Sequence, residues 1–445
     1  MISQLTVEKL CEGREPDARK LLPRFVTAVS PLVGIIRLLE EERDYYNDEP
    51  TTLLHRAEVV PTNRISSSGY AKRAAEGGRG FDPDETVVGA VFEAFERYSL
   101  SVYQEEDLLL GSHRSILAQG RQAVAPSRFL CAQTSTDDDR RRADDIQRAW
   151  VPGLSMATGS ECLVPAQSVY LPYFASDEEG YLRDPLTTGA ASGLSRAAAA
   201  RRGLLEVVER DAVMLMHYLQ LEPARLDTRG CTDHRLVELL ADAGRHNLHI
   251  RLFRIPTDLP AHVVVAQVID PSGVGPEMTV GSKASLSLTD AMVGAALEAI
   301  CFRRGLRDRF DYAKNYAERH LRSGMDINCL EERTYYWMQP GMSSTLSYLD
   351  QAELAVAPEH FRDHVGSMRR LVSYILDQIG DIVVCDVATS DVREMGVSVV
   401  KVVIPELQPM HLAEPLKVFT SRLLGFGASH GHGDLTPTSV PHPFL

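Results

Sequence analysis

Two segments of this chain place carboxylates inside helices that are otherwise apolar, which restricts the possible folds strongly. The stretch GLLEVVERDA, residues 203–212, carries Glu206 and Glu209 three positions apart, so both would lie on one face of a helix. Leucine, valine and alanine cover most of the remaining circumference, which predicts a helix that is buried nearly all round. Buried carboxylates are costly unless they are paired or bind a metal ion. The helix therefore needs a partner that its own sequence does not fully supply.

The same spacing recurs upstream. The segment VFEAFERYS contains Glu93, Glu96 and Arg97, and a third apolar segment, ALEAICFRR, contains Glu298 and Arg303. Each E-x-x-E-R helix would offer two carboxylates on one face with an arginine beside them. Four carboxylates facing one cavity repel each other unless a divalent cation neutralises them, and hard oxygen ligands of this kind suit Mg²⁺. Because Mg²⁺ usually brings phosphates with it, the pattern indicates a site for a phosphate-bearing ligand.

Each motif also has a purely structural explanation. Glu93 with Arg97, and Glu206 with Arg210, are i,i+4 pairs that would stabilise an exposed helix by about 0.2–0.5 kcal/mol. The glycine-rich loop GGRG ahead of the first helix could hold phosphate through its backbone N–H groups, but a lone loop of this kind is weak evidence. Two copies of the acidic motif on apolar helices favour the metal site over the simple ion pairs.

Composition and charge limit the class of protein. A chain of 445 residues with 44% hydrophobic residues can bury one large core or two to three ordinary ones. The formal net charge of −14 argues against a nucleic-acid binder and against attraction to an anionic membrane surface. The seven cysteines contain no C-x-x-C pair, so neither a disulfide framework nor a structural zinc site is indicated. With no signal peptide and no run of roughly 18 apolar residues, we expect a soluble cytoplasmic protein without nucleic-acid or membrane partners.

The element pattern predicts an α+β fold. Residues 1–60 are expected to form a mostly helical N-terminal segment, and residues 61–445 the main domain with an irregular, proline-containing C-terminal tail. Segments rich in β-branched and aromatic residues alternate with helical patterns in that domain. The expected strands are QSVYLPYF, HIRLFRI, HVVVAQVI, IVVCDVA and VSVVKVVI, and the expected helices span residues 86–103, 137–150, 196–219, 233–246, 289–319 and 358–378.

Several blocks resemble, in their order, the YcaO superfamily, and within it the D component of the azoline-forming cyclodehydratases of ribosomal peptide biosynthesis. The blocks are GGRGFDPDETVVGAVFEAFERYS, WVPGLSMATG with VPAQSVYLPY, SGLSRAAAARRGLLEVVERDA, GSKASLSLTDAMVGAALEAICFRR, DVATSDVREMGVSVVKVVIPELQP and the final PHPFL. The resemblance covers the chain from about Ser66 to Leu445. It implies a YcaO-type fold in which mixed sheets and helices surround a central cleft for nucleotide and Mg²⁺.

The resemblance also implies the site residues, with ATP and Mg²⁺ as cofactors between the acidic helices. The expected metal ligands are Glu93, Glu96, Glu206 and Glu209. The expected nucleotide-binding residues are Arg79, Arg97, Arg210, Glu298 and Arg303, of which Arg97 and Arg210 would contact phosphate or hold the carboxylates. The tail would reach the active site, so the expected catalytic residues are Pro441, Pro443 and Leu445.

In that family a Cys, Ser or Thr side chain of a precursor peptide attacks the preceding backbone carbonyl, and ATP phosphorylates the resulting oxyanion. Phosphorylation converts the amide oxygen, a poor leaving group, into a good one. The resemblance thus implies a cyclodehydratase that forms thiazoline or oxazoline within a multi-protein complex, as in the biosynthesis of thiazole/oxazole-modified microcin antibiotics. The implied partners are the precursor peptide, a leader-binding E1-like (ThiF-like) protein and, where azoles are made, a flavin-dependent azoline dehydrogenase.

Six positions depart from the family pattern, and one of them is the final residue, Leu445, where many relatives have a proline. Arg79 replaces a lysine, Gly89 a serine, Leu194 an asparagine, Ala198 a glutamate and Cys301 a glutamine. Leucine and alanine cannot ligate a metal, and a cysteine coordinates Mg²⁺ poorly. Two alternatives therefore stay open: a non-catalytic or partner-dependent scaffold subunit with a weakened ATP site, and an ATP-dependent enzyme that forms a thioamide or an amidine.

Overall fold

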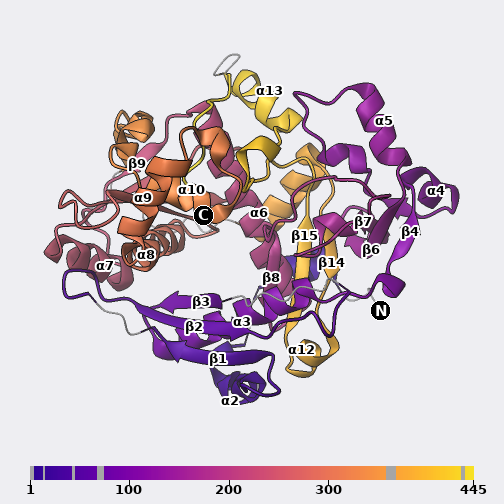
Figure 1. The fold of residues 1–445 in the computed structure, drawn as a ribbon, viewed down its shortest axis with the longest axis horizontal. Helices are drawn as coiled ribbons and strands as arrows, with labels where there is room; N and C mark the ends of the chain where they lie inside the picture. Colours follow the sequence, from indigo (N-terminus) through magenta and orange to yellow (C-terminus); the bar gives the residue numbers. More distant parts are fainter. Residues whose placement is uncertain are drawn as a thin grey trace. The chain divides into compact units, whose positions relative to one another are not determined.

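The computed structural model describes residues 5–13, 16–42, 46–67, 75–356, 367–431 and 436–444. The chain forms two compact units, and Figure 1 labels many of their elements. Unit 1 comprises Met1–Glu42, Leu53–Val207 and Met368–Leu407, and unit 2 comprises Arg43–Thr52, Val208–Ser367 and Gln408–Leu445. The division falls inside helix α6 (Arg196–Leu219), so this helix contributes to both units. The predicted boundary at residue 60 does not coincide with this division.

Unit 1 contains two sheets. A three-stranded antiparallel sheet has the order β1–β2–β3, with strands β1 (Ile36–Glu41), β2 (Leu53–Val59) and β3 (Ala75–Gly80). A seven-stranded sheet has the order β5–β7–β6–β14–β15–β8, with β4 also paired to β6. Its strands are β4 (Leu109–Gly111), β5 (Gln122–Ala123), β6 (Arg148–Ser155), β7 (Glu161–Pro165), β8 (Ala190–Gly193), β14 (Val383–Asp386) and β15 (Ser398–Val403). Apart from the parallel pair β5–β7, its strand pairs are antiparallel.

Helix α3 (Pro83–Ser101) packs on β2 and β3, and Figure 1 shows it beside the three-stranded sheet. Its N-cap is Asp82, whose side chain accepts a hydrogen bond from the Glu85 N–H. A Cβ atom at Gly78 would lie 1.9 Å from the Thr86 carbonyl oxygen, and Gly89 faces the Cα of Gly78. Both glycines are therefore required for close packing of the strand against the helix.

The core of unit 1 brings α3 together with both sheets. It contains Ala90, Phe95, Val151, Val383 and Val399, all of them buried. Other helices of unit 1 include α1 (Val7–Cys11), α2 (Leu22–Phe25), α4 (His113–Ala118), α5 (Asp137–Asp145), α11 (Met368–Tyr374) and α12 (Ser390–Glu394). The apolar face of the E-x-x-E-R helix α3 thus packs into the core, as the sequence pattern predicts.

The prediction that residues 1–60 are mostly helical is wrong from residue 36 onwards, where β1 and β2 form. Burial alternates at the end of β2: Ala57 and Val59 are buried, Arg56 before them is exposed, and Glu58 between them is half-buried. A repeat of two residues is typical of a strand with one face on a core. In the described residues before residue 26, the segment contains the short helices α1 and α2.

Unit 2 is built on a five-stranded sheet with the order β12–β11–β10–β9–β13. Its strands are β9 (Ala224–Leu226), β10 (His249–Arg254), β11 (His262–Ile269), β12 (Met278–Ser285) and β13 (Leu354–Val356). Helices of this unit include α7 (His234–Arg245), α8 (Leu288–Arg307), α9 (Phe310–His320), α10 (Leu330–Trp337) and α13 (Ser421–Ser429). Helix α8 covers β11 and β12, and a core that includes Val264, Ala266, Met292 and Ala295 fills the interface between them.

A glycine sets the distance between β12 and α8. A Cβ atom at Gly281 would lie 2.5 Å from both the Ala295 carbonyl oxygen and the Ala299 nitrogen, and 2.9 Å from the Cβ of Glu298. Only a residue without a side chain fits at this distance. The close approach brings the carboxylate of Glu298 over β12.

The α+β prediction is confirmed, and most predicted elements occur near their expected positions. Four predicted strands correspond to β10, β11, β14 and β15, and α6 has the predicted bounds. The segment QSVYLPYF is not a strand: it contains a 3-10 turn, Ala166–Ser168, and then irregular chain, because Pro172 cannot donate to a strand ladder. The predicted helix 289–319 is divided into α8 and α9, and part of the predicted helix 358–378 lies outside the described residues. No helix in the described ranges has the length and apolar character needed to cross a membrane.

Candidate functional site

Two of the predicted carboxylates meet on strand β12 in unit 2. The Glu209 Oε1 atom on α6 accepts a hydrogen bond from the Ser282 hydroxyl at 2.6 Å, and its Oε2 atom accepts one from the Ala284 N–H at 2.9 Å. The Glu298 Oε2 atom on α8 accepts a hydrogen bond from the Ser282 N–H at 2.8 Å. Glu209 and Glu298 are 4% and 7% exposed. Ser282 therefore holds one carboxylate from each of two helices.

The surroundings of Glu209 keep its carboxyl group ionised. Burial alone raises the pKa of this group, but the charges of Arg210 and Lys283 and the hydrogen bonds from Ser282 and Ala284 outweigh burial and lower the pKa below its usual value. The nearest Arg210 nitrogen, Nη1, lies 4.0 Å from the Glu209 Oε1 atom. A carboxylate that is buried yet ionised is suited to bind a cation.

The first E-x-x-E-R helix has a different arrangement, in unit 1. The Arg97 guanidinium lies between the two carboxylates of its own helix, with Nη2 3.3 Å from Glu93 Oε1 and Nη1 3.8 Å from Glu96 Oε1. The side chains of Glu93 and Arg97 are 34% and 23% exposed, so water still reaches this group. Arg97 thus holds the carboxylates, which is one of the two roles that the sequence allows for it.

A buried lysine on β15 lies near the carboxylates of unit 1. Lys401 is 3% exposed, and its ammonium group donates a hydrogen bond to the Leu186 carbonyl. Burial lowers the pKa of Lys401, and the nearby carboxylates of Glu206 and Glu96 oppose this shift. The Glu206 Oε2 atom accepts a hydrogen bond from the Gly189 N–H at 3.1 Å. The sequence analysis missed Lys401, although a single lysine within the apolar strand VSVVKVVI is a detectable signal.

The predicted metal ligands are thus distributed over both units. Glu93, Glu96 and Glu206 belong to unit 1, and Glu209, one helical turn beyond Glu206 on α6, belongs to unit 2. Within the ranges that the structure describes, no three His, Cys, Asp or Glu side chains are grouped closely enough to hold a metal ion. The donors nevertheless fit Mg²⁺, since they are hard oxygens, and Glu209 uses two of about four lone-pair positions for its hydrogen bonds. The four-carboxylate magnesium site stays a prediction.

The Arg303 guanidinium is engaged inside unit 2, and its predicted contact with the nucleotide stays a prediction. Its Nε atom donates to Glu49 Oε2 at 3.0 Å, Nη1 to the Pro276 carbonyl at 2.6 Å and Nη2 to Asp270 Oδ2 at 2.6 Å. Arg303 is 3% exposed. Each of the three guanidinium nitrogens of Arg303 thus donates to a carboxylate or a carbonyl of unit 2.

The glycine-rich segment before α3 is strand β3 and not a loop. Gly78 is used for packing on α3, so the hypothesis that this segment cradles phosphate as a glycine-rich loop is wrong. Arg79 is exposed on β3, opposite Leu54 in the strand register. Its predicted contact with the nucleotide remains a prediction.

The departures from the family pattern lie in packed surroundings. Leu194 packs against the core of unit 1, and Ala198 is 1% exposed. Cys301, 7% exposed, belongs to the core of unit 2, where its thiol donates to the Thr52 hydroxyl. These three side chains therefore contribute to packing.

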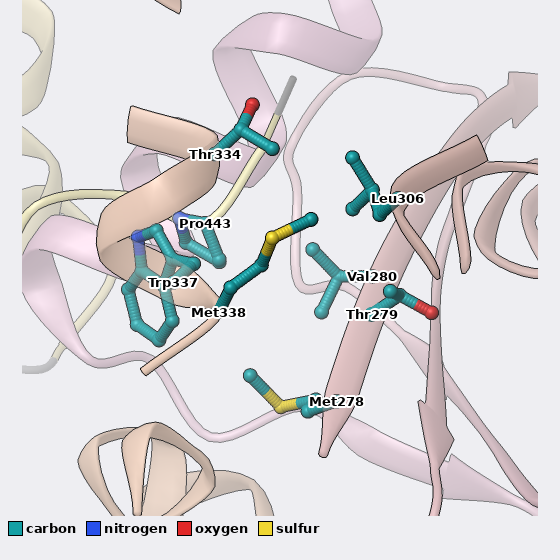
Figure 2. Close-up of a pocket in the computed structure, with 8 residues that line it drawn as sticks. All are labelled: Met278, Thr279, Val280, Leu306, Thr334, Trp337, Met338 and Pro443. Carbon is teal, nitrogen blue, oxygen red and sulfur yellow. The ribbon is translucent and has the colours of Figure 1, made fainter. Parts of the chain in front are cut away.

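The C-terminal residues are well packed in unit 2. We call residues 436–444 the tail segment; it has no regular secondary structure, as predicted, and Leu445 lies outside the described residues. The preceding segment differs from the prediction, since α13 extends to Ser429 from an N-cap at Thr420. Figure 2 shows Pro443 at a small apolar pocket of unit 2. The other lining residues are Met278, Thr279, Val280, Leu306, Thr334, Trp337 and Met338.

Comparisons with known proteins identify the family and the fold. A family model described as YcaO cyclodehydratase, ATP- and Mg²⁺-binding, matches residues 77–408. A solved heterocyclase in complex with substrate and cofactor has a TM-score of 0.74 and 19% identity, over 99% of this chain and 60% of that one. YcaO from Methanopyrus kandleri bound with AMPPCP and Mg²⁺ has a TM-score of 0.60 and 21% identity, over 86% and 89% of the two chains. The E. coli microcin synthetase McbBCD complex gives 0.59 and 17%, over 83% and 87%. The chain spans about 60% of the length of the first of these proteins.

Proposed function

Because this chain belongs to the YcaO cyclodehydratase family, which binds ATP and Mg²⁺, we propose that it is an azoline-forming peptide cyclodehydratase subunit. It converts Cys, Ser or Thr residues of a ribosomally made precursor peptide into thiazoline or oxazoline. The observation that carries the proposal is the position of Glu209, a buried carboxylate of the predicted E-x-x-E-R helix α6 that accepts hydrogen bonds from Ser282 and Ala284 of β12. Metal ligands must be deprotonated, and the charges of Arg210 and Lys283, together with these hydrogen bonds, lower the pKa of Glu209 and so favour the deprotonated form.

The proposed site consists of metal-binding carboxylates and of residues that hold these carboxylates in position. When bound, Mg-ATP supplies the phosphoryl group that turns the amide oxygen into a leaving group. Glu93, Glu96, Glu206 and Glu209 are the proposed metal ligands. Ser282 fixes Glu209 and Glu298, and Arg97 holds Glu93 and Glu96. Lys401 offsets the negative charge beside Glu206.

The substrate and partners are proposed on the same basis. The similar heterocyclase was solved with its substrate, and the similar microcin synthetase is a complex of several chains. We expect the present chain to act on a precursor peptide together with a leader-binding E1-like protein, and with a flavin-dependent dehydrogenase where azoles are made. The tail segment, with Pro441 and Pro443, is proposed to act at the reacting peptide, as is Leu445.

Mass spectrometry of a co-expressed precursor peptide tests the proposal. Each modified residue should lose one water, and Glu209→Gln should abolish the loss while Glu238→Gln does not, because Glu238 is an exposed residue of α7. A peptide that keeps its mass in the presence of the E1-like partner would contradict the proposal. Replacement of oxygen by sulfur in the product would instead identify a thioamide-forming enzyme.

A second candidate is a scaffold subunit that has lost nucleotide affinity. The packed positions of Leu194, Ala198 and Cys301 favour it, since none of these side chains replaces the polar group of the family pattern. Isothermal titration with Mg-ATP separates the two candidates. Binding in the micromolar range supports the enzyme, and no heat of binding, alone and with the partner protein, supports the scaffold.

A further inference from the structure

The tail segment presents carbonyl groups that need donors from elsewhere in unit 2. Pro441 and Pro443 have no N–H group, so this part of the chain cannot form a ladder with a strand. The Val440 carbonyl accepts a hydrogen bond from the His217 Nε2 atom at 2.9 Å. The His442 carbonyl accepts two hydrogen bonds, which α10 supplies. A buried carbonyl with both lone pairs used is fixed in position.

The two donors to the His442 carbonyl are Arg333 and Trp337. The Arg333 Nη1 atom lies 3.1 Å and the Trp337 Nε1 atom 2.9 Å from this oxygen. Arg333 is itself 0% exposed and held by the Glu414 carboxylate, 2.7 Å away, and by the Leu412 carbonyl, 2.9 Å away. The guanidinium is thus oriented by unit 2 independently of the tail segment, and it meets the tail as a preformed donor.

The side chains at residues 441–444 of the tail segment are buried as well. His442 is 0% exposed, and its Nε2–H donates to the His411 carbonyl at 2.8 Å. Phe444 is 3% exposed. Pro441 lies against Gly324, where a Cβ atom would be 2.4 Å from the proline Cγ. Figure 2 shows Pro443 beside Trp337, both at the small apolar pocket.

We propose that Arg333 and Trp337 are positioning residues whose two hydrogen bonds to the His442 carbonyl set the register of the tail segment. We call this pair of hydrogen bonds the latch. It fixes which tail residues are held in unit 2 and where Pro441 and Pro443 lie. The consequence for catalysis rests on the proposed function, in which the tail acts at the reacting peptide, whereas the latch itself is a property of unit 2.

A matched pair of tryptophan variants tests the latch. The chain has two tryptophans, and both donate an indole N–H to a backbone carbonyl: Trp337 to His442 at 2.9 Å and Trp150 to Gly111 at 2.7 Å. Trp337→Phe removes one latch bond, and Trp150→Phe removes an equivalent bond in unit 1. Carboxypeptidase treatment of the native 445-residue chain, followed by intact mass, reports how often the tail segment opens.

The last residues should be removed about tenfold faster from Trp337→Phe than from the wild type, and at the wild-type rate from Trp150→Phe. Gly324→Ala provides a second route, because the added Cβ displaces Pro441 without changing either donor. It should also accelerate removal. Unchanged removal rates in both Trp337→Phe and Gly324→Ala would overturn the latch.

Turnover measurements separate the latch from the proposed function. If the tail acts in the reaction, Trp337→Phe lowers kcat while the KM for Mg-ATP stays at the wild-type value. Faster removal of the last residues with unchanged kcat would overturn the catalytic consequence and leave the latch intact. If the wild type modifies no peptide, the proposed function fails, and the carboxypeptidase rates still decide whether the latch exists.

Discussion

In unit 2, Glu209 and Glu298 are held by a strand, whereas in unit 1, Glu93 and Glu96 are held by an arginine of their own helix. The strand donors are a hydroxyl and backbone N–H groups at 2.6–2.9 Å, and both unit 2 carboxylates are almost fully buried. The Arg97 contacts are 3.3 and 3.8 Å long and partly exposed. A strand cannot change its donors without unfolding, but a long side chain can rotate. The unit 2 group is therefore preorganised, and the unit 1 group can adjust when ligands bind.

The largest effect is expected from Glu209→Gln. The substitution keeps the size of the side chain but removes the charge that Arg210, Lys283 and the β12 donors stabilise. We expect turnover to fall at least about 100-fold, which corresponds to about 2.7 kcal/mol of transition-state stabilisation. Peptide turnover at saturating Mg-ATP measures it, with Glu238→Gln as the control. A fall of less than threefold would remove Glu209 from the proposed site.

Ser282→Ala tests whether the strand preorganises Glu209. The variant loses the hydroxyl donor to Glu209 but keeps the backbone N–H that binds Glu298. We expect the free energy of unfolding to decrease by about 2 kcal/mol, because the lost hydrogen bond goes to a buried charged group. Urea denaturation measures this change. Ser285→Ala, on the same strand, is the control, and equal losses in both variants would contradict the special role of Ser282.

Glu93→Gln should affect activity without affecting stability. The Glu93 side chain is 34% exposed, so loss of its contact with Arg97 should change the free energy of unfolding by less than about 0.5 kcal/mol. Turnover should fall about tenfold if Glu93 is a metal ligand. Parallel urea curves and Mg²⁺ titrations of turnover measure both quantities. A loss of stability as large as that of Ser282→Ala would break the comparison between the two units.

The smallest effect is expected from pH. The pKa of Glu209 is lowered in the folded protein, so its ionised form adds stability above the carboxyl pKa of the unfolded chain, about 4.5. This contribution is lost as the pH falls below that value and through the folded pKa. The difference in stability between the wild type and Glu209→Gln should thus be constant from pH 7 to about pH 5 and shrink below it. Thermal denaturation in this pH range measures it, and a difference that grows towards acid would contradict the lowered pKa.

Local patterns in the sequence are sufficient to predict the helices that carry the site. The E-x-x-E-R helices were predicted because apolar residues recur with the helical period around the glutamates, and α6 has the predicted bounds, Arg196–Leu219. The resemblance to the YcaO superfamily is confirmed by the match to residues 77–408. The strands β1 and β2 were missed, because they are short segments beside the strongly charged run EEERDYYNDEP.

The partners of the carboxylates could not be predicted from local patterns. Ser282 lies 73 residues from Glu209, and only the packing of α6 and α8 against β12 brings them together. The partners of Arg303 could not be predicted for the same reason, since Glu49 is 254 residues away. A charged residue in an otherwise apolar helix indicates that a partner is needed, but which residue is the partner depends on the tertiary structure.

The close contact at Gly281 extends the site beyond its charged residues. Gly281 has no side chain that could bind a substrate or a cation. Because it lacks a Cβ atom, however, the helix that carries Glu298 packs closely on the strand that carries Ser282. An alanine at this position would push the helix away from the strand and lengthen the hydrogen bond from the Ser282 N–H to the Glu298 carboxylate. A chain with the same acidic and basic residues but an alanine at this position would therefore hold Glu298 less closely over β12.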